Sequence, residues 1–449
     1  MNEWIVRMTC FTMLAAARHG LANLFACLAI LLSMPLQAEG WSMNDATIVY
    51  PLPQSAAELN QLLAPHDVGP GGAVLPLKYW QRIPPINQGE SAARTYRNLR
   101  VVAVRLDPCF KYQGDCLPQV RMVWQPIDRA DYGSVSPFGL EAKDASVHTF
   151  HTMDADVFRR FLEDYEQLLG AAARNVGQVP LQVHPVIREQ GLGGEFSRGL
   201  KTLLLKYCGA QNLWRVTSMS TLVGGDKWEF RGFNIVDGKP VEIVIPRTGS
   251  ARTQSFFVSR ASDREYSNGL ITPSPTGKDN INLLLRDSRF LANKDAAILK
   301  GLGGSVARIE NPGIHSPESM DCVSCHSTQV AGSLLFGRIQ WLNKDPQIIG
   351  QAFRSSPPVQ YLPATQNMPR VFRALGYFEK SPVLSRRVIN ETAIAVGLLN
   401  EKHPRQVSLP VQGGGNASRS SPGGEVSSKL AAVSTDRKPG LTAAAGRDL

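Results

Sequence analysis

The feature that most constrains this chain is the stretch Met320-Asp321-Cys322-Val323-Ser324-Cys325-His326, in which two thiols lie three residues apart and an imidazole follows the second. A helical turn between the two cysteines would place the histidine on the same side as both thiols. This is the attachment pattern of c-type haem, in which the cysteines form thioethers and the histidine binds the iron. The motif predicts one covalent haem c held by Cys322 and Cys325, with His326 as the proximal iron ligand.

Two other kinds of site use paired cysteines. A zinc knuckle needs two further ligands at suitable spacing, and the chain has no second CxxC. A thioredoxin-like redox pair needs a strand before the motif, whereas Asn311-Pro312-Gly313 and Ser316-Pro317 indicate a loop. We therefore favour haem attachment over both.

The length of 449 residues predicts two or three domains, each large enough to bury a core. The net charge is +10, but Lys and Arg are scattered and do not interleave with aromatic residues, so we expect no nucleic-acid binding. A mildly basic surface favours an acidic redox partner protein.

The N-terminus predicts a targeting segment. Arg7 and Arg18 form a positive region, residues 21–36 form an apolar run, and Leu36-Gln37-Ala38 is an acceptable cleavage site. We expect a signal peptide at residues 1–38, export to the periplasm or an equivalent compartment, and no stable membrane span after cleavage. The alternative of an uncleaved signal anchor stays open, although the run is short for a spanning helix.

Export also bears on the cysteines that remain after cleavage. An oxidising compartment permits Cys109 and Cys116 to close a short loop as a disulfide, pinning a hairpin between strands at residues 96–106 and 119–127. Cys208 ends an apolar helix and is expected to be a buried small hydrophobe.

The chain order predicts an α+β region followed by a small all-α domain. Apolar spacing predicts helices at residues 154–173, with Asp154 as cap, and at 196–207, while Gly224-Gly225-Asp226 and Asp237-Gly238 separate short strands. Residues 280–302 are helical in pattern and should end at Gly303-Gly304. The expected parts are a signal peptide (1–38), an irregular lead-in (39–95), an α+β domain of unknown function (96–300), a haem domain (303–405) and a disordered tail (406–449).

Residues 303–405 resemble a class I monohaem cytochrome c. After the haem motif come Met368-Pro369 and then a helix at residues 386–400, the order in which that family places its distal methionine and C-terminal helix. The resemblance implies a small all-α cytochrome c-like fold with Met368 as distal iron ligand. A core methionine is the other interpretation of Met368, and His315, His403 or an open position are the other candidates for the sixth site.

Further side chains are candidates for the surroundings of the cofactor. Arg338 and Trp341, with Tyr361 and Arg370, could donate to the haem propionates, although core aromatics and surface arginines are equally common. His148 and His151 would share a helical face and could bind a metal, but no third ligand is evident and we expect surface residues.

Three functional hypotheses follow. The first is an exported monohaem protein that transfers electrons, with the α+β region as partner dock or scaffold. The second is a haem-dependent oxidoreductase or peroxidase-like enzyme acting on a small molecule, although a peroxidase of the cytochrome c type should carry two CxxCH motifs. The third is a haem-based sensor. Whether the chain is an enzyme stays open, with electron transfer favoured.

Overall fold

The computed structural model describes residues 40–87, 89–129, 139–171, 179–222, 227–261, 265–361, 372 and 374–405. Residues from Trp41 to Pro404 belong to one compact unit. The predicted signal peptide, the predicted disordered tail and Met368 all lie outside the described residues.

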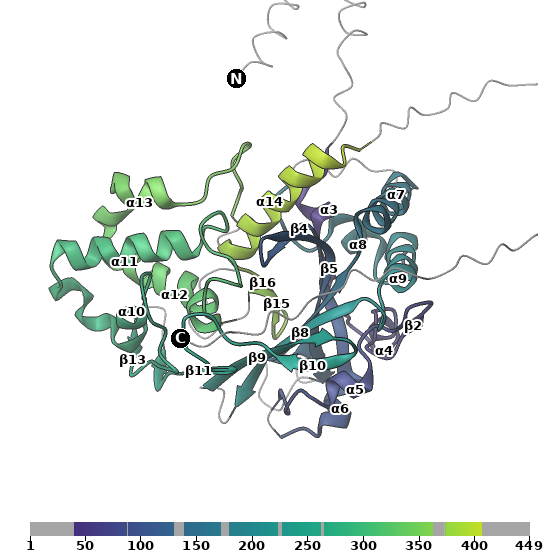
Figure 1. Cartoon of the computed structure of the whole chain (residues 1–449), viewed down its shortest axis with the longest axis horizontal. Coiled ribbons are helices and arrows are strands. Elements are labelled where there is room, and N and C mark those ends of the chain that lie inside the picture. Colours follow the sequence, from purple (N-terminus) through teal and green to yellow (C-terminus); the bar gives the residue numbers. More distant parts are fainter. Residues whose placement is uncertain are drawn as a thin grey trace, which may run out of the picture. The chain divides into compact units, whose positions relative to one another are not determined.

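A large antiparallel sheet organises the unit (Figure 1). Its order is β1-β4-β5-β7-β8-β9-β11-β14, with β6 beside β5 and β10 beside β9. Strand β4 is rich in Val and almost continuously buried, because elements cover this part of the sheet on both faces, whereas β9 alternates buried and half-buried residues over its first half. The strands are β1 Thr47–Val49, β4 Leu99–Tyr112, β5 Asp115–Arg129, β6 Leu140–Ala142, β7 Ser146–Thr152, β8 Leu213–Leu222, β9 Lys227–Val236, β10 Lys239–Glu242, β11 Thr253–Phe257 and β14 Leu270–Thr272.

Two predicted hairpins are confirmed. Gln113 and Gly114 join β4 to β5 with positive φ of 51° and 95°, which is the two-residue turn that matches strand twist. The Cys109–Cys116 disulfide bridges the two strands beside this turn, as the sequence predicts. Asp237 and Gly238 make an equivalent turn between β9 and β10.

The helices lie around the sheet. The predicted helices appear as α7 and α9, and Asp154 caps α7 by accepting from the Val157 amide at 2.7 Å. The strand expected from residue 96 begins only at Leu99, because Ser91 caps a short helix, α6, through that point. The helices are α3 Met43–Ala46, α4 Ala56–Leu59, α5 Leu77–Trp80, α6 Ala92–Asn98, α7 Ala155–Ala171, α8 Pro185–Gln190, α9 Glu195–Tyr207, α10 Asn282–Arg286, α11 Ala296–Ile309, α12 Cys322–Arg338, α13 Pro346–Gln351 and α14 Arg386–Lys402.

The lead-in at residues 39–95 is mostly irregular, yet it contributes to the core. Its segment β1 pairs with β4, and the side chains of Trp41, Ile48 and Trp80 are almost fully buried. Two 3-10 helices, η1 Ser288–Asn293 and η2 Gln340–Lys344, and three short pairs of strands make up the rest of the described secondary structure: β2 Val68–Gly69 with β3 Gly72–Ala73, β12 Arg260–Ala261 with β13 Tyr266–Ser267, and β15 Leu375–Phe378 with β16 Ser381–Leu384.

The prediction of a small all-α unit at residues 303–405 is not confirmed, because the region contains the β15–β16 hairpin. Its helices also lack a core of their own. Helices α11 and α12 bury Val306 and Leu335 in a cluster that includes Trp228 and Phe256 from the sheet, and α14 packs along β4. Figure 1 shows α14 beside β4, and α11 and α12 next to each other. The CxxCH motif therefore lies against the sheet.

The helix expected over residues 280–302 is wrong in two ways, since the span divides into α10, a 3-10 helix and α11, and α11 runs past Gly303-Gly304 to Ile309. These glycines instead allow helices to approach closely. A Cβ atom on Gly303 would lie 2.6 Å from Ile348 Cδ1 of α13, and one on Gly332 of α12 would lie 2.8 Å from Val306 Cγ1 of α11. A missing side chain at such a contact lets two helix backbones pack at short distance.

We expect Gly332→Val to destabilise the fold by about 1–3 kcal/mol, because its side chain would overpack the α11–α12 contact. The control is Gly301→Ala in α11, where an added Cβ meets nothing within 4 Å. That change should stabilise by up to about 1 kcal/mol through helix propensity alone. Urea denaturation of both variants measures the difference, and an equal effect from both would contradict the packing role of Gly332.

Candidate functional site

The CxxCH motif forms the first turn of α12, and buried groups from β11 and a loop fix that turn. Asp321 is the N-cap and accepts from the Ser324 amide at 3.0 Å. The side chain of Gln254 donates to Asp321 at 3.0 Å and accepts from the Val323 amide at 2.9 Å. Arg247 pairs with the other Asp321 oxygen at 3.3 Å. The start of this helix is therefore tied to the sheet.

This turn brings the three motif side chains to one cavity. Cys322, Cys325 and His326 occupy positions i, i+3 and i+4 of the helix, and all three line the same space. The two thiols are half-buried and are not bonded to each other. Burial raises the pKa of Cys322 to about 12 and that of Cys325 to about 11, so both are protonated at neutral pH.

His326 has one ring nitrogen bound and one available. Its Nδ1 lies 2.5 Å from the Phe372 carbonyl oxygen, which makes Nδ1 the donor. No hydrogen bond to Nε2 occurs among the described residues. Its ring packs on Phe230 with 4.8 Å between centroids, and burial lowers the pKa of His326. A neutral imidazole with its second nitrogen fixed by a carbonyl is the usual arrangement of a metal-binding histidine.

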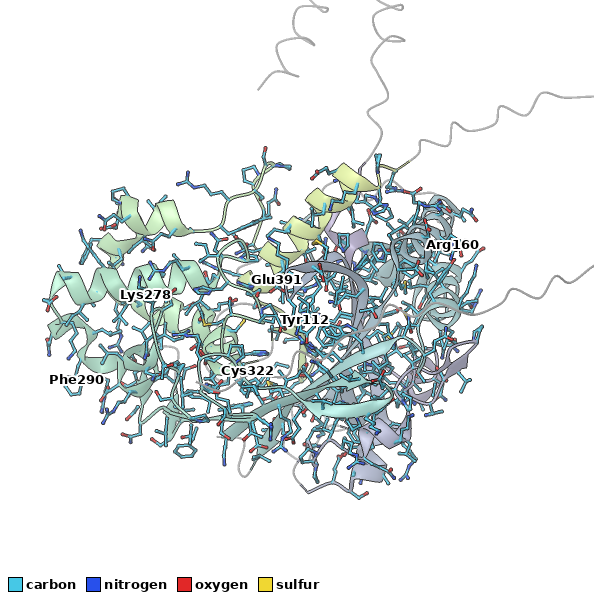
Figure 2. All side chains as sticks on the ribbon, in the orientation of Figure 1. Tyr112, Arg160, Lys278, Phe290, Cys322 and Glu391 are labelled. Carbon is cyan, nitrogen blue, oxygen red and sulfur yellow. A yellow bond between two sulfur atoms is a disulfide. The ribbon has the colours of Figure 1, made fainter. Side chains whose placement is uncertain are left out.

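The cavity contains about 1130 Å³ of space not filled by protein atoms, its mouth included. The side chains of α12 face the inner surface of β5, β7, β8 and β9, and α14 contributes Arg387, Val388 and Glu391. Cys322 and Glu391 are both labelled in Figure 2, on α12 and α14. The cavity is thus enclosed by segments from very different parts of the sequence.

Cross-strand pairing orders the sheet side of the cavity into three rows. Because the rise is about 3.4 Å per residue, rows two residues apart are separated by about 7 Å, and the first and third by about 14 Å. The rows are Ser146, Met219 and Phe230; then His148, Thr217 and Gly232; then Arg121, Phe150 and Arg215. His326 contacts the first row through Phe230. The backbone of the arginine row therefore lies about 14 Å from the row that His326 contacts, although the Arg121 guanidinium is near enough to His326 to act on its charge.

Charged groups concentrate around the arginine row. Glu391 accepts from Arg105, and its other oxygen accepts from Arg387 Nε at 2.7 Å. Burial alone would raise the pKa of Glu391, but the nearby arginines outweigh it and hold that pKa well below its usual range. Arg215 donates to Asn234 at 2.7 Å and pairs with Glu318.

His148 and His151 differ from the sequence-based expectation. They lie on strand β7, where residues three apart point to opposite faces, so they share no helical face. His148 lines the cavity, and burial, with Arg121 nearby, lowers its pKa. His151 is fully buried, with Nε2 at 3.3 Å from Thr149 Oγ1. Neither is a simple surface residue.

The predicted propionate donors lie elsewhere. Arg338 donates to the Ser288 carbonyl at 2.8 Å, and Trp341 is 44% exposed. Neither lines the cavity. Tyr361 donates to Asn390 at 2.6 Å, and Arg370 lies outside the described residues.

The histidines predicted as alternative sixth ligands of the iron also lie outside the cavity. His315 lies 2.7 Å from Asp279, and His403 packs edge-on against Phe158, so neither reaches the cavity. Met368 is outside the described residues, and the structure does not place it. Within the described part of the cavity, His148 and Met219 are the side chains on the sheet side that carry an atom able to ligate iron.

Sequence reasoning missed the polar side of the cavity. Arg121, His148 and Arg215 are charged or titratable residues inside strands that are otherwise apolar, at alternate positions on one face. Such inward-facing polar residues in a buried strand are unusual and point to a site. The polar residues inside apolar strands can be seen in the sequence, but only the strand register shows that the three lie close together.

Comparisons of the chain with models of protein families, with curated proteins and with solved structures find no match. In the part of the chain that the structure describes, no helix is long and apolar enough to cross a membrane. Within the same residues, no group of three or more His, Cys, Asp or Glu side chains is placed to hold a metal ion. A proposal for the function therefore depends on the residues of the cavity alone.

Proposed function

We propose that this chain is an exported c-type haem protein that transfers electrons. The observation that carries the proposal is that Cys322, Cys325 and His326 occupy one helical turn and line one cavity, with His326 Nδ1 bound to the Phe372 carbonyl. Two free thiols and one imidazole with an available nitrogen fit the donor set of covalent haem. Bound haem would supply an iron that exchanges single electrons.

The residues around the motif would hold and orient that group. Cys322 and Cys325 would form the thioethers, and His326 would ligate the iron through Nε2, while the Phe372 carbonyl fixes the ring orientation. Phe230 packs against the imidazole and excludes water from it. Met368 stays our proposal for the distal ligand, a pairing with histidine that raises the reduction potential relative to two imidazoles.

The remaining parts of the proposal concern context. The predicted signal peptide at residues 1–38 supports a periplasmic or otherwise exported location, where Cys109 and Cys116 can stay oxidised. The net charge of +10 supports an acidic redox partner protein. No nucleic-acid partner and no stable membrane span after cleavage are proposed.

We keep only part of the resemblance to class I cytochromes c in the proposal. The order of haem motif, Met368 and α14 supports it, and α14 contacts α12. The sheet, however, takes the place of other helices on one side of the cavity. We propose a cytochrome c-like arrangement of α11, α12 and α14 that is completed by the sheet.

Absorption spectra test this function. Full-length protein, produced with c-type haem maturation machinery, should contain covalent haem and show a low-spin ferric spectrum with a methionine-to-iron band. Met368→Ala should remove that band, because the sulfur ligand is lost, while His148→Ala should keep it. Wild-type protein without covalent haem would contradict the whole proposal.

A second candidate function is a haem-dependent enzyme or sensor. The observation that favours it is the polar wall of the cavity, where the His148 imidazole has no hydrogen bond among the described residues. Such a group could donate to a small molecule beside the iron. A high-spin wild type, unchanged by Met368→Ala but altered by His148→Ala and able to bind diatomic gases, would support this candidate over electron transfer.

A further inference from the structure

Arg121 is a buried cation whose hydrogen-bonding groups are not all used. It lies on β5 in the third row of the cavity and is 8% exposed. Its Nε and Nη2 atoms are buried, and neither has a hydrogen-bond partner among the described residues. Leaving a buried donor without a partner is costly, and more so for a charged group. Such an arrangement points to a ligand that accepts hydrogen bonds from this side chain.

The neighbouring carboxylates do not satisfy Arg121. Asp107 accepts from Arg105 Nε at 2.8 Å, while Arg121 Nε is 3.8 Å away, beyond hydrogen-bond distance. Glu391 is taken by Arg105 and Arg387. Arg387 also donates to the carbonyls of Ile309 and His315. The neighbouring arginines therefore donate hydrogen bonds to protein groups, whereas Nε and Nη2 of Arg121 donate none and its contact with Asp107 is an ion pair without a hydrogen bond.

The charges do not balance around the arginine row. Arg105, Arg121, Arg215 and Arg387 face the carboxylates of Asp107, Glu318 and Glu391, which leaves one positive charge unmatched among the described residues. Burial, with Arg105 nearby, lowers the pKa of Arg121 to about 10, so the guanidinium is still charged at neutral pH. An anion would complete the cluster.

Aromatic rings hold the two cavity arginines in place. The Arg121 guanidinium lies 4.7 Å from the centre of the Phe150 ring, and Phe150 pairs across the strands with Arg215. The guanidinium of Arg215 stacks on Trp214 at 4.3 Å. Arg215 uses Nε and Nη1 for Asn234 and Glu318, and no bond to its Nη2 occurs among the described residues. Two fixed guanidinium groups suit the planar fork geometry of a carboxylate or oxyanion.

We propose that Arg121, together with Arg215, forms a binding subsite for a carboxylate or small oxyanion at the arginine row of the cavity. The anion has two sources that share this chemistry. One is a propionate of the haem itself, which rests on the proposed function. The other is a small diffusible anion that enters the cavity.

The experiment compares Arg121→Gln and Arg121→Lys with Arg338→Gln, whose arginine lies outside the cavity. Sulfate and formate are titrated at constant ionic strength into haem-loaded full-length protein and into the haem-free Cys322→Ala/Cys325→Ala form. Thermal denaturation reports binding, and the midpoint potential of the loaded forms is measured in parallel. Arg121→Lys keeps the positive charge but loses the planar fork, so it replaces Arg121→Gln as the test variant if Arg121→Gln folds poorly.

Each source has its own expected result. If the anion is diffusible, loaded wild type binds sulfate or formate, and Arg121→Gln weakens this at least about tenfold while Arg338→Gln does not. If a propionate occupies the subsite, only haem-free protein binds these anions, again through Arg121, and Arg121→Gln shifts the midpoint potential of the loaded protein. Arg121→Lys should fall between wild type and Arg121→Gln.

The proposal is overturned if neither form binds either anion in an Arg121-dependent way and the midpoint potential is unchanged. Failure of the proposed function gives a different result, because the maturation machinery then attaches no haem to wild-type protein. The haem-free titration still tests the subsite in that case.

Discussion

Replacing both Cys322 and Cys325 by alanine should abolish covalent haem attachment. The two thiols are the free cysteines that line the cavity, so no other described thiol can form a thioether there. Denaturing gels stained for haem peroxidase activity, together with the mass of the denatured chain, measure attachment. We expect wild-type protein to keep its haem after denaturation and the double variant to lose it entirely.

The matched control is Cys208→Ala, because this thiol is also free but lies buried away from the cavity. It should leave attachment unchanged, with only a small loss of stability from the deleted sulfur. Single Cys322→Ala and Cys325→Ala variants should each keep one thioether and attach haem in reduced yield. Haem that stays with the double variant after denaturation would show that the CxxCH motif is not the attachment site.

Changing Glu391 to glutamine should cost about 3–5 kcal/mol of folding stability at neutral pH. The carboxylate lies between the buried guanidinium groups of Arg105 and Arg387, and its loss leaves both charges poorly compensated. Urea denaturation at pH 7 measures the effect. Glu401→Gln is the control, since Glu401 is exposed on the same helix and its removal should change stability by no more than about 0.5 kcal/mol.

The stability difference between wild type and Glu391→Gln should also depend on pH. The folded-state pKa of Glu391 lies below its unfolded value of about 4.3, because Arg105 and Arg387 stabilise the ionised form against the effect of burial. Its contribution is fully present above that unfolded pKa and is lost as the pH falls through the folded value. The stability difference between wild type and Glu391→Gln should therefore shrink below about pH 4. A constant difference from pH 7 to pH 3 would contradict the ionic role of Glu391.

Local sequence patterns predicted much of the secondary structure. The helix with Asp154 as its cap, the turn at Asp237-Gly238 and the Cys109–Cys116 bridge each depend on residues close together in the chain. Spacing and turn chemistry are local properties, so one sequence is enough to show them. Gly303-Gly304 misled for the opposite reason, because the packing of α11 against α13 decides their role.

The candidate site could be predicted only in part. The CxxCH spacing brought Cys322, Cys325 and His326 together through a single helical turn. Arg121, His148 and Glu391 come from β5, β7 and α14, and their meeting depends on strand register and on helix packing over the sheet. Arg338 and Trp341 follow the motif in sequence, yet they lie outside the cavity.

The prediction of a small all-α unit at residues 303–405 was not confirmed, for a related physical reason. The helices of residues 303–405 have apolar faces, and the sequence alone does not say what covers them. In the structure Trp228 and Phe256 of the sheet bury part of those faces, so the region shares its core with residues far earlier in the chain.

The anchoring of Asp321 by Gln254 and of His326 by Phe372 has a consequence for biosynthesis. Both contacts close around the motif from outside its own helix, one from β11 and one from the segment before β15. Once they form, the two thiols are half-buried and their turn is fixed against the sheet. On the proposed function, an attachment enzyme would reach the thiols before these contacts close. Folding of the sheet over the motif would then be the last step of maturation, and premature folding would trap a chain that can no longer be modified.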